Sequence, residues 1–218
     1  MSSSSPKGPS SPTAVDLYWL PLGAHGCSVR SKGRVFEAYA ARRQKRPARE
    51  LCIAVLEVTL GSDRFVIETT PVRSDCAAHD GALQGPMWGL PARLGRSPLL
   101  RYEVRRSSDC LIPEDPDAAS GPRCVGRKEA NARNLLGLVP QIPDLTWGRD
   151  QLGAGDAWNS NLMVAWLLGR SGHHVRDVVP PPRCRAPGWA AGLALARARA
   201  DHPPLVGRVT SYREAAQR

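Results

Sequence analysis

Residues 147–170 combine the side chains best suited to chemistry with the strongest helical pattern of the chain. The first half of this stretch is a glycine-rich loop that contains Asp156 and Trp158. The second half carries apolar residues at three-to-four spacing with more apolar groups between them, which is typical of a buried helix. The polar step Asn159–Asn161 lies between the two halves, where this helix should begin.

The polar step has two interpretations, and the sequence leaves both open. Asn and Ser are favoured N-cap residues, so the step predicts a helix cap. Alternatively it is a reactive or binding position, because a helix N-terminus stabilises negative charge and places side chains at the mouth of a cleft. In that case Ser160 is the candidate nucleophile, and Asp156, Trp158, Asn159 and Asn161 line a ligand site.

The elements that must position this step are mostly strands. Period-two patterns and β-branched runs predict strands at residues 15–22, 34–38, 51–60, 64–70 and 99–105. Residues 39–50 are expected to be an exposed loop or a short helix, residues 127–139 a helix, and residues 189–198 a short helix or strand. Strands that come first and a buried helix that comes late predict an α+β domain, with a mostly antiparallel sheet packed on that helix.

The run 51–60 is apolar on both faces, which is typical of a central strand covered on both sides. Residues 61–63 are expected to turn it into the following strand as a hairpin. Glu57 and Glu68 are the exceptions in this hairpin. Each must find a partner if it lies in the interior, where it could contribute to the ligand site, or else it emerges at a strand edge.

Composition limits the class of protein. The chain has 218 residues, 42% of them hydrophobic, and no apolar run approaches the roughly 20 residues of a membrane helix. We expect a disordered leader over residues 1–14, one globular domain over 15–198 and a basic tail over 199–218. The Ser- and Pro-rich start lacks the apolar segment of a secretory signal, so the expected location is cytoplasmic.

The formal net charge of +10 is concentrated in two regions. Residues 28–50 carry +6 and residues 183–218 carry +5, so the remainder carries −1. Only four of the 30 basic residues are lysines, a bias typical of a GC-rich genome. Neither region shows a recognition-helix pattern or alternating aromatic and basic residues, so nucleic acid is the less favoured partner.

The six cysteines, at positions 27, 52, 76, 110, 124 and 184, are widely spread and contain no Cys-x-x-Cys pair. No histidine lies at ligand spacing from them, which argues against a zinc or redox site. For a cytoplasmic chain we therefore expect six reduced thiols, with no metal and no cofactor.

Seven short runs together resemble an uncharacterised actinobacterial protein family over about residues 15–196. These runs are Tyr18–Gly23, Gly33–Glu37, Leu56–Glu57, Phe65–Glu68, Trp147–Gly155, Trp158–Asn161 and Arg185–Trp189. This resemblance implies no particular function.

The element order, a sheet strand before a late buried helix, resembles the circularly permuted papain-like fold of the NlpC/P60 and lecithin-retinol acyltransferase type. That resemblance implies a cysteine at the start of the helix and a histidine on the strand. Ser160 occupies the nucleophile position here, and the strand position falls near Ile53, so neither is the expected type. His25, in a neighbouring loop, is the candidate base.

Three functions follow as expectations. The first is a degenerate or weakly active papain-like protein that binds an unidentified small-molecule, peptide, amide or acyl ligand. The second is a hydrolase or acyltransferase with Ser160 as nucleophile and His25 as base. The third is a basic interaction module that binds nucleic acid or an acidic protein. The oligomeric state is left open.

Overall fold

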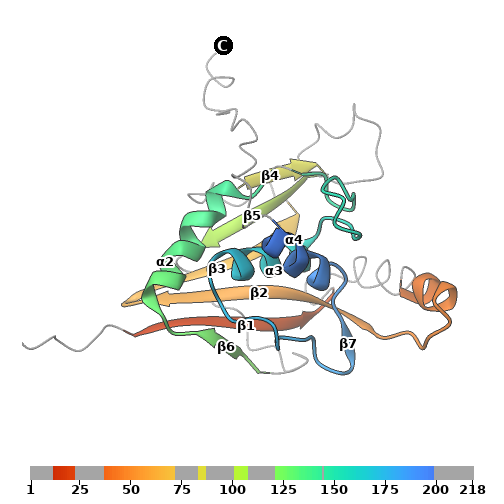
Figure 1. Cartoon of the computed structure of the whole chain (residues 1–218), viewed down its shortest axis with the longest axis horizontal. Helices are drawn as coiled ribbons and strands as arrows, with labels where there is room; N and C mark the ends of the chain where they lie inside the picture. The colour runs from red at the N-terminus through yellow and green to blue at the C-terminus, as the bar shows by residue number, and fades with distance from the viewer. Residues whose placement is uncertain are drawn as a thin grey trace, which may run out of the picture.

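Strands and helices segregate to two layers in the computed structural model of this protein (Figure 1). The structure describes residues 12–22, 37–71, 83–86, 101–107, 121–143 and 145–198. The strands are β1 (Thr13–Pro21), β2 (Glu50–Leu60), β3 (Asp63–Pro71), β4 (Leu83–Pro86), β5 (Arg101–Ser107), β6 (Arg123–Gly126) and β7 (Cys184–Arg185). The helices are α2 (Glu129–Leu138), the short 3-10 helix η2 (Val139–Gln141), α3 (Ser160–Arg170) and α4 (Trp189–Ala198).

The sheet has the strand order β4-β5-β3-β2-β1-β6, and β7 pairs with β2. Neighbouring strands are antiparallel, except that β7 runs parallel to β2. The predicted α+β class, with a mostly antiparallel sheet packed on a late buried helix, is confirmed.

The hairpin of β2 and β3 forms where the sequence predicts it. Leu60 pairs with Asp63, and the turn between them contains Gly61 at a φ of 63°. This left-handed conformation is accessible to glycine at no steric cost. On its other side β2 pairs with β1 from Leu60 down to Cys52, so it is the central strand that its apolar pattern indicates.

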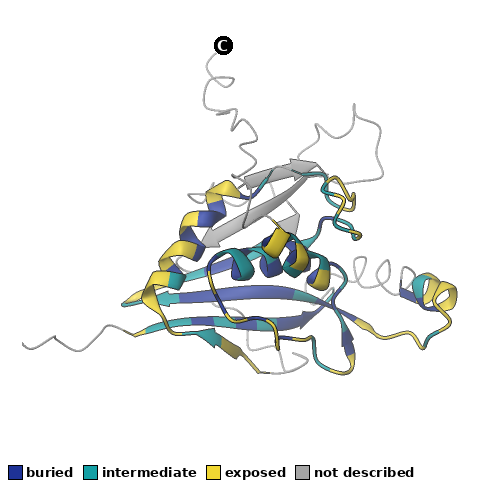
Figure 2. Cartoon of the chain, in the orientation of Figure 1, coloured by how far each residue is buried: buried dark blue, intermediate teal, exposed yellow. Residues whose placement is uncertain are grey.

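The two faces of the sheet are covered differently. Leu17, Leu56 and Ile67 share one buried core with residues of α2, α3 and α4. Figure 2 shows these helices over one face of the sheet, with buried residues along the central strands. Val55 and Val66 belong to a second buried cluster, and alternation along the strands assigns them to the opposite face.

Helix α3 is the buried helix that the sequence predicts. Eight of its 11 residues are buried, and it ends at Ser171 before Gly172, which has a φ of 83°. α4 crosses it closely, because a Cβ at Gly192 would lie 2.3 Å from the carbonyl oxygen of Leu162. Residues 189–198 therefore form a helix rather than a strand.

Some predicted elements differ from the structure. Residues 37–43 are helical, so the predicted strand over residues 34–38 is wrong at its last two positions, while residues 34–36 lie outside the described residues. The short strands β4, β6 and β7 were not predicted, because two to four residues are too few to establish a period. Strand β1 begins at Thr13, inside the predicted leader, whereas residues 1–11 and the tail from residue 199 lie outside the described residues.

The prediction of six reduced thiols is wrong for two of the cysteines. Cys52 and Cys184 form a disulfide, with 5.7 Å between their Cα atoms, so these two thiols are not reduced. Their separation of 132 residues hides this proximity in the sequence, but the parallel pairing of Glu50 with Cys184 brings β7 beside the start of β2. Cys124 is an exposed thiol, and positions 27, 76 and 110 lie outside the described residues.

Candidate functional site

The amino end of α3 lies against β2, as the sequence predicts. The side chain of Asn161 accepts a hydrogen bond from the backbone N–H of Ala54 at 2.7 Å. Its amide nitrogen donates to the carbonyl oxygens of Cys52 at 2.9 Å and Pro187 at 3.1 Å. The acceptor and both donors of this buried side chain are thus engaged within the fold.

The position of Asn161 follows from a fork in the sheet. The β2–β3 ladder ends at the pair Leu56 and Ile67, after which β3 continues beside β5. This divergence leaves backbone groups of β2 without a strand partner, and buried backbone groups require one. Asn161 bonds to β2 at Cys52 and Ala54, and β7 pairs with it at Glu50.

Asn159 is the N-cap of α3, which confirms the cap interpretation for this residue. Its Oδ1 accepts from the backbone N–H of Leu162 at 3.0 Å. Asp156 accepts from the backbone N–H of Gly188 at 2.7 Å. Gly188 has a φ of 85°, and a Cβ there would lie 2.7 Å from Oδ1 of Asn159, so only glycine fits this contact.

Ser160 lies within this packed region and is 4% exposed. Among the residues that the structure describes, no imidazole or carboxylate is hydrogen-bonded to its hydroxyl. His25, the candidate base, lies outside the described residues. Trp158 is buried in the main core.

Glu57 and Glu68 do not face this helix. Alternation along β2 and β3 assigns both carboxylates to the sheet face opposite α3, with Val55 and Val66. Glu57 is buried and accepts from Nε of Arg64 at 3.1 Å and from the Tyr18 hydroxyl at 3.4 Å. Burial, and secondarily the Glu57 charge, raise the pKa of Tyr18. The fold therefore separates these carboxylates from Ser160.

His173 is a buried polar side chain beyond the opposite end of α3. Its backbone N–H donates to the carbonyl oxygen of Leu168, and its Nδ1 lies 2.7 Å from the Ser171 hydroxyl. Its Nε2 has no hydrogen-bond partner within the described part of the chain. Burial, and then the neighbouring His174, lower the pKa of His173.

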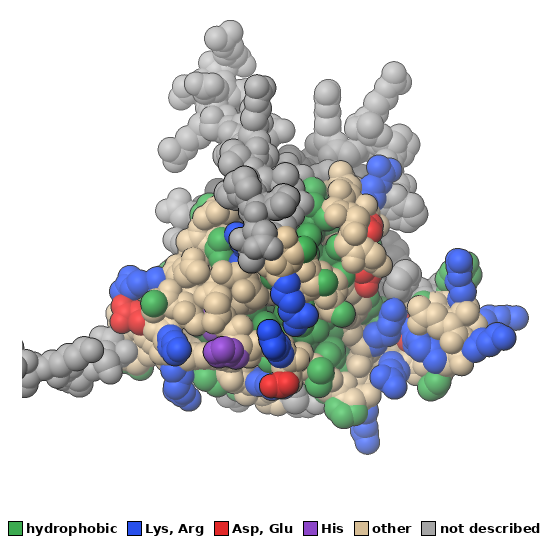
Figure 3. Space-filling model, in the orientation of Figure 1, with side chains coloured by type: hydrophobic (Ala, Val, Ile, Leu, Met, Phe, Trp, Pro, Cys, Tyr) green, Lys and Arg blue, Asp and Glu red, His purple; other side chains and the backbone are tan. Residues whose placement is uncertain are grey.

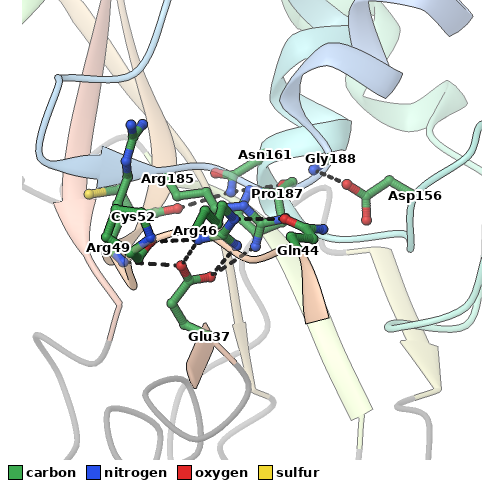
Figure 4. A network of polar contacts seen from close by, with 11 residues as sticks. Glu37, Gln44, Arg46, Arg49, Cys52, Asp156, Asn161, Arg185, Pro187 and Gly188 are labelled. Carbon is green, nitrogen blue, oxygen red and sulfur yellow. Dashed lines mark hydrogen bonds and ion pairs between the residues drawn. The ribbon is translucent and has the colours of Figure 1, made fainter. Parts of the chain in front are cut away.

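A larger polar network surrounds Glu37 and was not predicted (Figure 4). The Glu37 carboxylate is buried and accepts from Arg46 at 2.5 and 3.2 Å, from Arg185 at 3.0 Å and from the backbone N–H of Arg49 at 3.1 Å. The hydrogen bond from Arg46 is the main cause that lowers the pKa of Glu37 to about 2. A carboxylate with this pKa is a poor proton acceptor near neutral pH, so the network is not suited to acid–base catalysis.

This network joins the two basic regions of the sequence. Arg46 comes from the first region and Arg185 from the second, and both bind the same carboxylate. We define the basic surface as the cations of residues 42–49 and 183–185: Arg42, Arg43, Lys45, Arg46, Arg49, Arg183 and Arg185. Figure 3 shows basic side chains gathered over helix 37–43 and beside it. The one signal in the sequence was that Glu37 is the only acidic residue among the many cations of residues 28–49.

Comparison with models of known protein families, with curated proteins and with solved structures finds no match. No helix in the described ranges combines the length and apolar character that crossing a membrane requires. Nor do three or more His, Cys, Asp or Glu side chains gather there in a group that could hold a metal ion.

Proposed function

We propose that this protein is a non-catalytic binding module that binds an anionic partner on its basic surface. The observation that carries this proposal is the ion-pair network in which Glu37 holds Arg46 and Arg185 together from distant parts of the chain. This is the basic interaction module expected as one of three functions from the sequence.

The charge balance of the network supports an anionic partner. One carboxylate neutralises only one of the two guanidinium groups that bind it. The side chains of Arg42, Arg43 and Arg49 are exposed nearby in sequence. Arginine forms bidentate hydrogen bonds with phosphate and carboxylate groups. Because Glu37 holds the side chains of Arg46 and Arg185 in place beforehand, binding by these two residues costs less conformational entropy.

The other two expected functions have less support. Both a degenerate papain-like ligand site and a hydrolase depend on available polar groups at the amino end of α3. There Asn159 and Asn161 bond to backbone, Asp156 bonds to Gly188, and Ser160 is buried. A nucleophilic serine needs a base within hydrogen-bond reach, and no described histidine is bonded to Ser160.

The compartment in which the protein works is also a matter of proposal. A cytoplasmic location is the expectation from the sequence. The Cys52–Cys184 disulfide favours a compartment in which disulfides persist, and such bonds are rare in reducing cytosol. Cells of the source are lysed directly into denaturant with an alkylating reagent. Modification of Cys52 and Cys184 would show a reduced pair and favour the cytoplasm, whereas protection of both would show that the disulfide persists.

Binding is tested with labelled polyglutamate and with inorganic polyphosphate at several salt concentrations. The triple variant Arg42→Glu, Arg43→Glu and Arg49→Glu should abolish binding to both at low salt. The matched control changes Arg127, Arg176 and Arg197 to Glu, which are exposed cations elsewhere and give the same net charge. The native protein should lose affinity steeply between about 0.05 and 0.2 M salt. Absence of binding, or an equal loss in the control, would contradict the proposal.

A further inference from the structure

An exposed tyrosine lies amid the cations of the basic surface. Tyr39 is 65% exposed, and Tyr39 and Val179 are the large apolar side chains most exposed among the described residues. The ring is therefore accessible to a partner, and its place beside exposed cations, rather than its exposure alone, carries the inference below.

The short helix 37–43 fixes the direction of this ring. Glu37 and Ala41, one helical turn apart, are both buried and form the inner side of the helix. Tyr39 lies about halfway around the helix from them, on the outer side. Arg42 and Arg43 follow it by three and four residues and are exposed, so on a helix they neighbour the ring.

We propose that the anionic partner is single-stranded nucleic acid, with a base stacked on Tyr39 and the neighbouring phosphates paired with Arg42, Arg43 and Arg49. This inference rests on the proposed function and names its partner. Non-specific binding of single strands combines a positively charged surface with aromatic rings on which bases stack. In a duplex the bases are already stacked, so Tyr39 adds little there.

The helical conformation of residues 37–43 answers the argument against nucleic acid, which was the absence of alternating aromatic and basic residues along the sequence. On a helix, however, neighbours on one side are three and four residues apart, so strict alternation is not required. An acidic protein segment would use the arginines but gain nothing specific from a base-sized ring.

The experiment measures fluorescence anisotropy with a short labelled single-stranded RNA, the duplex of the same sequence, and unlabelled polyphosphate as competitor. The single strand should bind more tightly than the duplex. Tyr39→Ala should weaken RNA binding by about 5- to 150-fold, the range measured for loss of one base–aromatic stack. Tyr39→Phe keeps the ring and should retain the affinity. The affinity for polyphosphate calculated from the competition should be equal in all three proteins, because polyphosphate has no bases.

Each contrary outcome has a distinct meaning. If polyphosphate and polyglutamate bind but Tyr39→Ala leaves RNA affinity unchanged, the partner is not nucleic acid and the proposed function stands. Preference for polyglutamate over RNA would assign an acidic protein instead. If none of the polyanions binds at low salt, both proposals fail. Thermal unfolding of each variant verifies folding, and Tyr39→Ala should unfold like the native protein because the ring is exposed.

Discussion

The side-chain nitrogen of Asn161 donates a hydrogen bond of 2.9 Å to the carbonyl oxygen of Cys52, a residue 109 positions earlier in the chain. The first residue belongs to the start of α3 and the second to β2, whose disulfide partner Cys184 lies in β7. The polar step that suggested chemistry in the sequence thus joins helix to sheet. We therefore expect substitutions of these residues to act mainly on the stability of the fold, rather than on an activity.

Replacing Asn161 by Ala should lower the free energy of unfolding by about 2 to 4 kcal/mol, because it leaves buried backbone groups at Cys52 and Ala54, and a half-buried one at Pro187, without partners. Urea titration measures this loss. Asn159→Ala is the comparison, since it removes an N-cap worth about 1 kcal/mol. An equal or smaller loss for Asn161→Ala would show that its bonds do not complete the edge of β2.

Replacing Glu37 by Gln should lower the free energy of unfolding by about 2 kcal/mol near neutral pH, since two guanidinium groups lose a charged acceptor. The native pKa of about 2 lies below the ordinary value of 4.5. The stabilisation is therefore complete above about pH 4.5 and is lost as pH falls toward 2. Unfolding of the native protein and the variant should converge over that interval. In the exposed control Glu129→Gln the difference from the native protein should stay small throughout.

The buried imidazole of His173 should also make the free energy of unfolding fall with decreasing pH, but over a higher pH range than Glu37. Its folded-state pKa is lowered from the ordinary 6.5, so the unfolded chain binds the proton more readily. Stability should be constant above about pH 6.5 and should fall as the pH decreases below it. His173→Gln should remove this dependence, whereas His174→Gln, at the exposed neighbour, should keep it. Thermal unfolding across this pH range measures both, and identical profiles would contradict the assignment.

The disulfide should contribute strongly to stability. Replacing Cys52 and Cys184 together by Ala removes a cross-link between residues 132 positions apart, and chain entropy predicts a loss of about 4 to 5 kcal/mol. Cys124→Ala, at an exposed thiol, should be neutral. Proteolytic mapping without reductant should recover the peptides of Cys52 and Cys184 linked to each other. Recovery of both as separate peptides would exclude the bond.

The sequence predicts those parts of the fold that local patterns specify. The apolar run of α3, the N-cap at Asn159 and the hairpin turn at Gly61 all produce local signals and were found where expected. Strand β7 is too short for a pattern, and the proximity of Cys184 to Cys52 depends on long-range pairing.

The candidate site was harder to predict for the same reason. Since β2 is apolar on both faces, its sequence did not show which face Glu57 occupies. The alternation around Glu37 resembled a strand, although the residue lies in a helix and its ion pair involves Arg185, 148 positions later. Neither relationship has a local signal.

The fork between β2 and β3 also has a consequence for biosynthesis. A ribosome completes β2 long before it reaches Asn161 and Arg185, whose segments occupy the diverging edge of that strand. Unpaired strand edges can pair with other chains. The nascent polypeptide therefore exposes the unpaired edge of β2 from the synthesis of this strand until residues 161–185 have been made. Fragments truncated before Arg185 are therefore expected to self-associate, and holdase chaperones should capture them more readily than the complete protein.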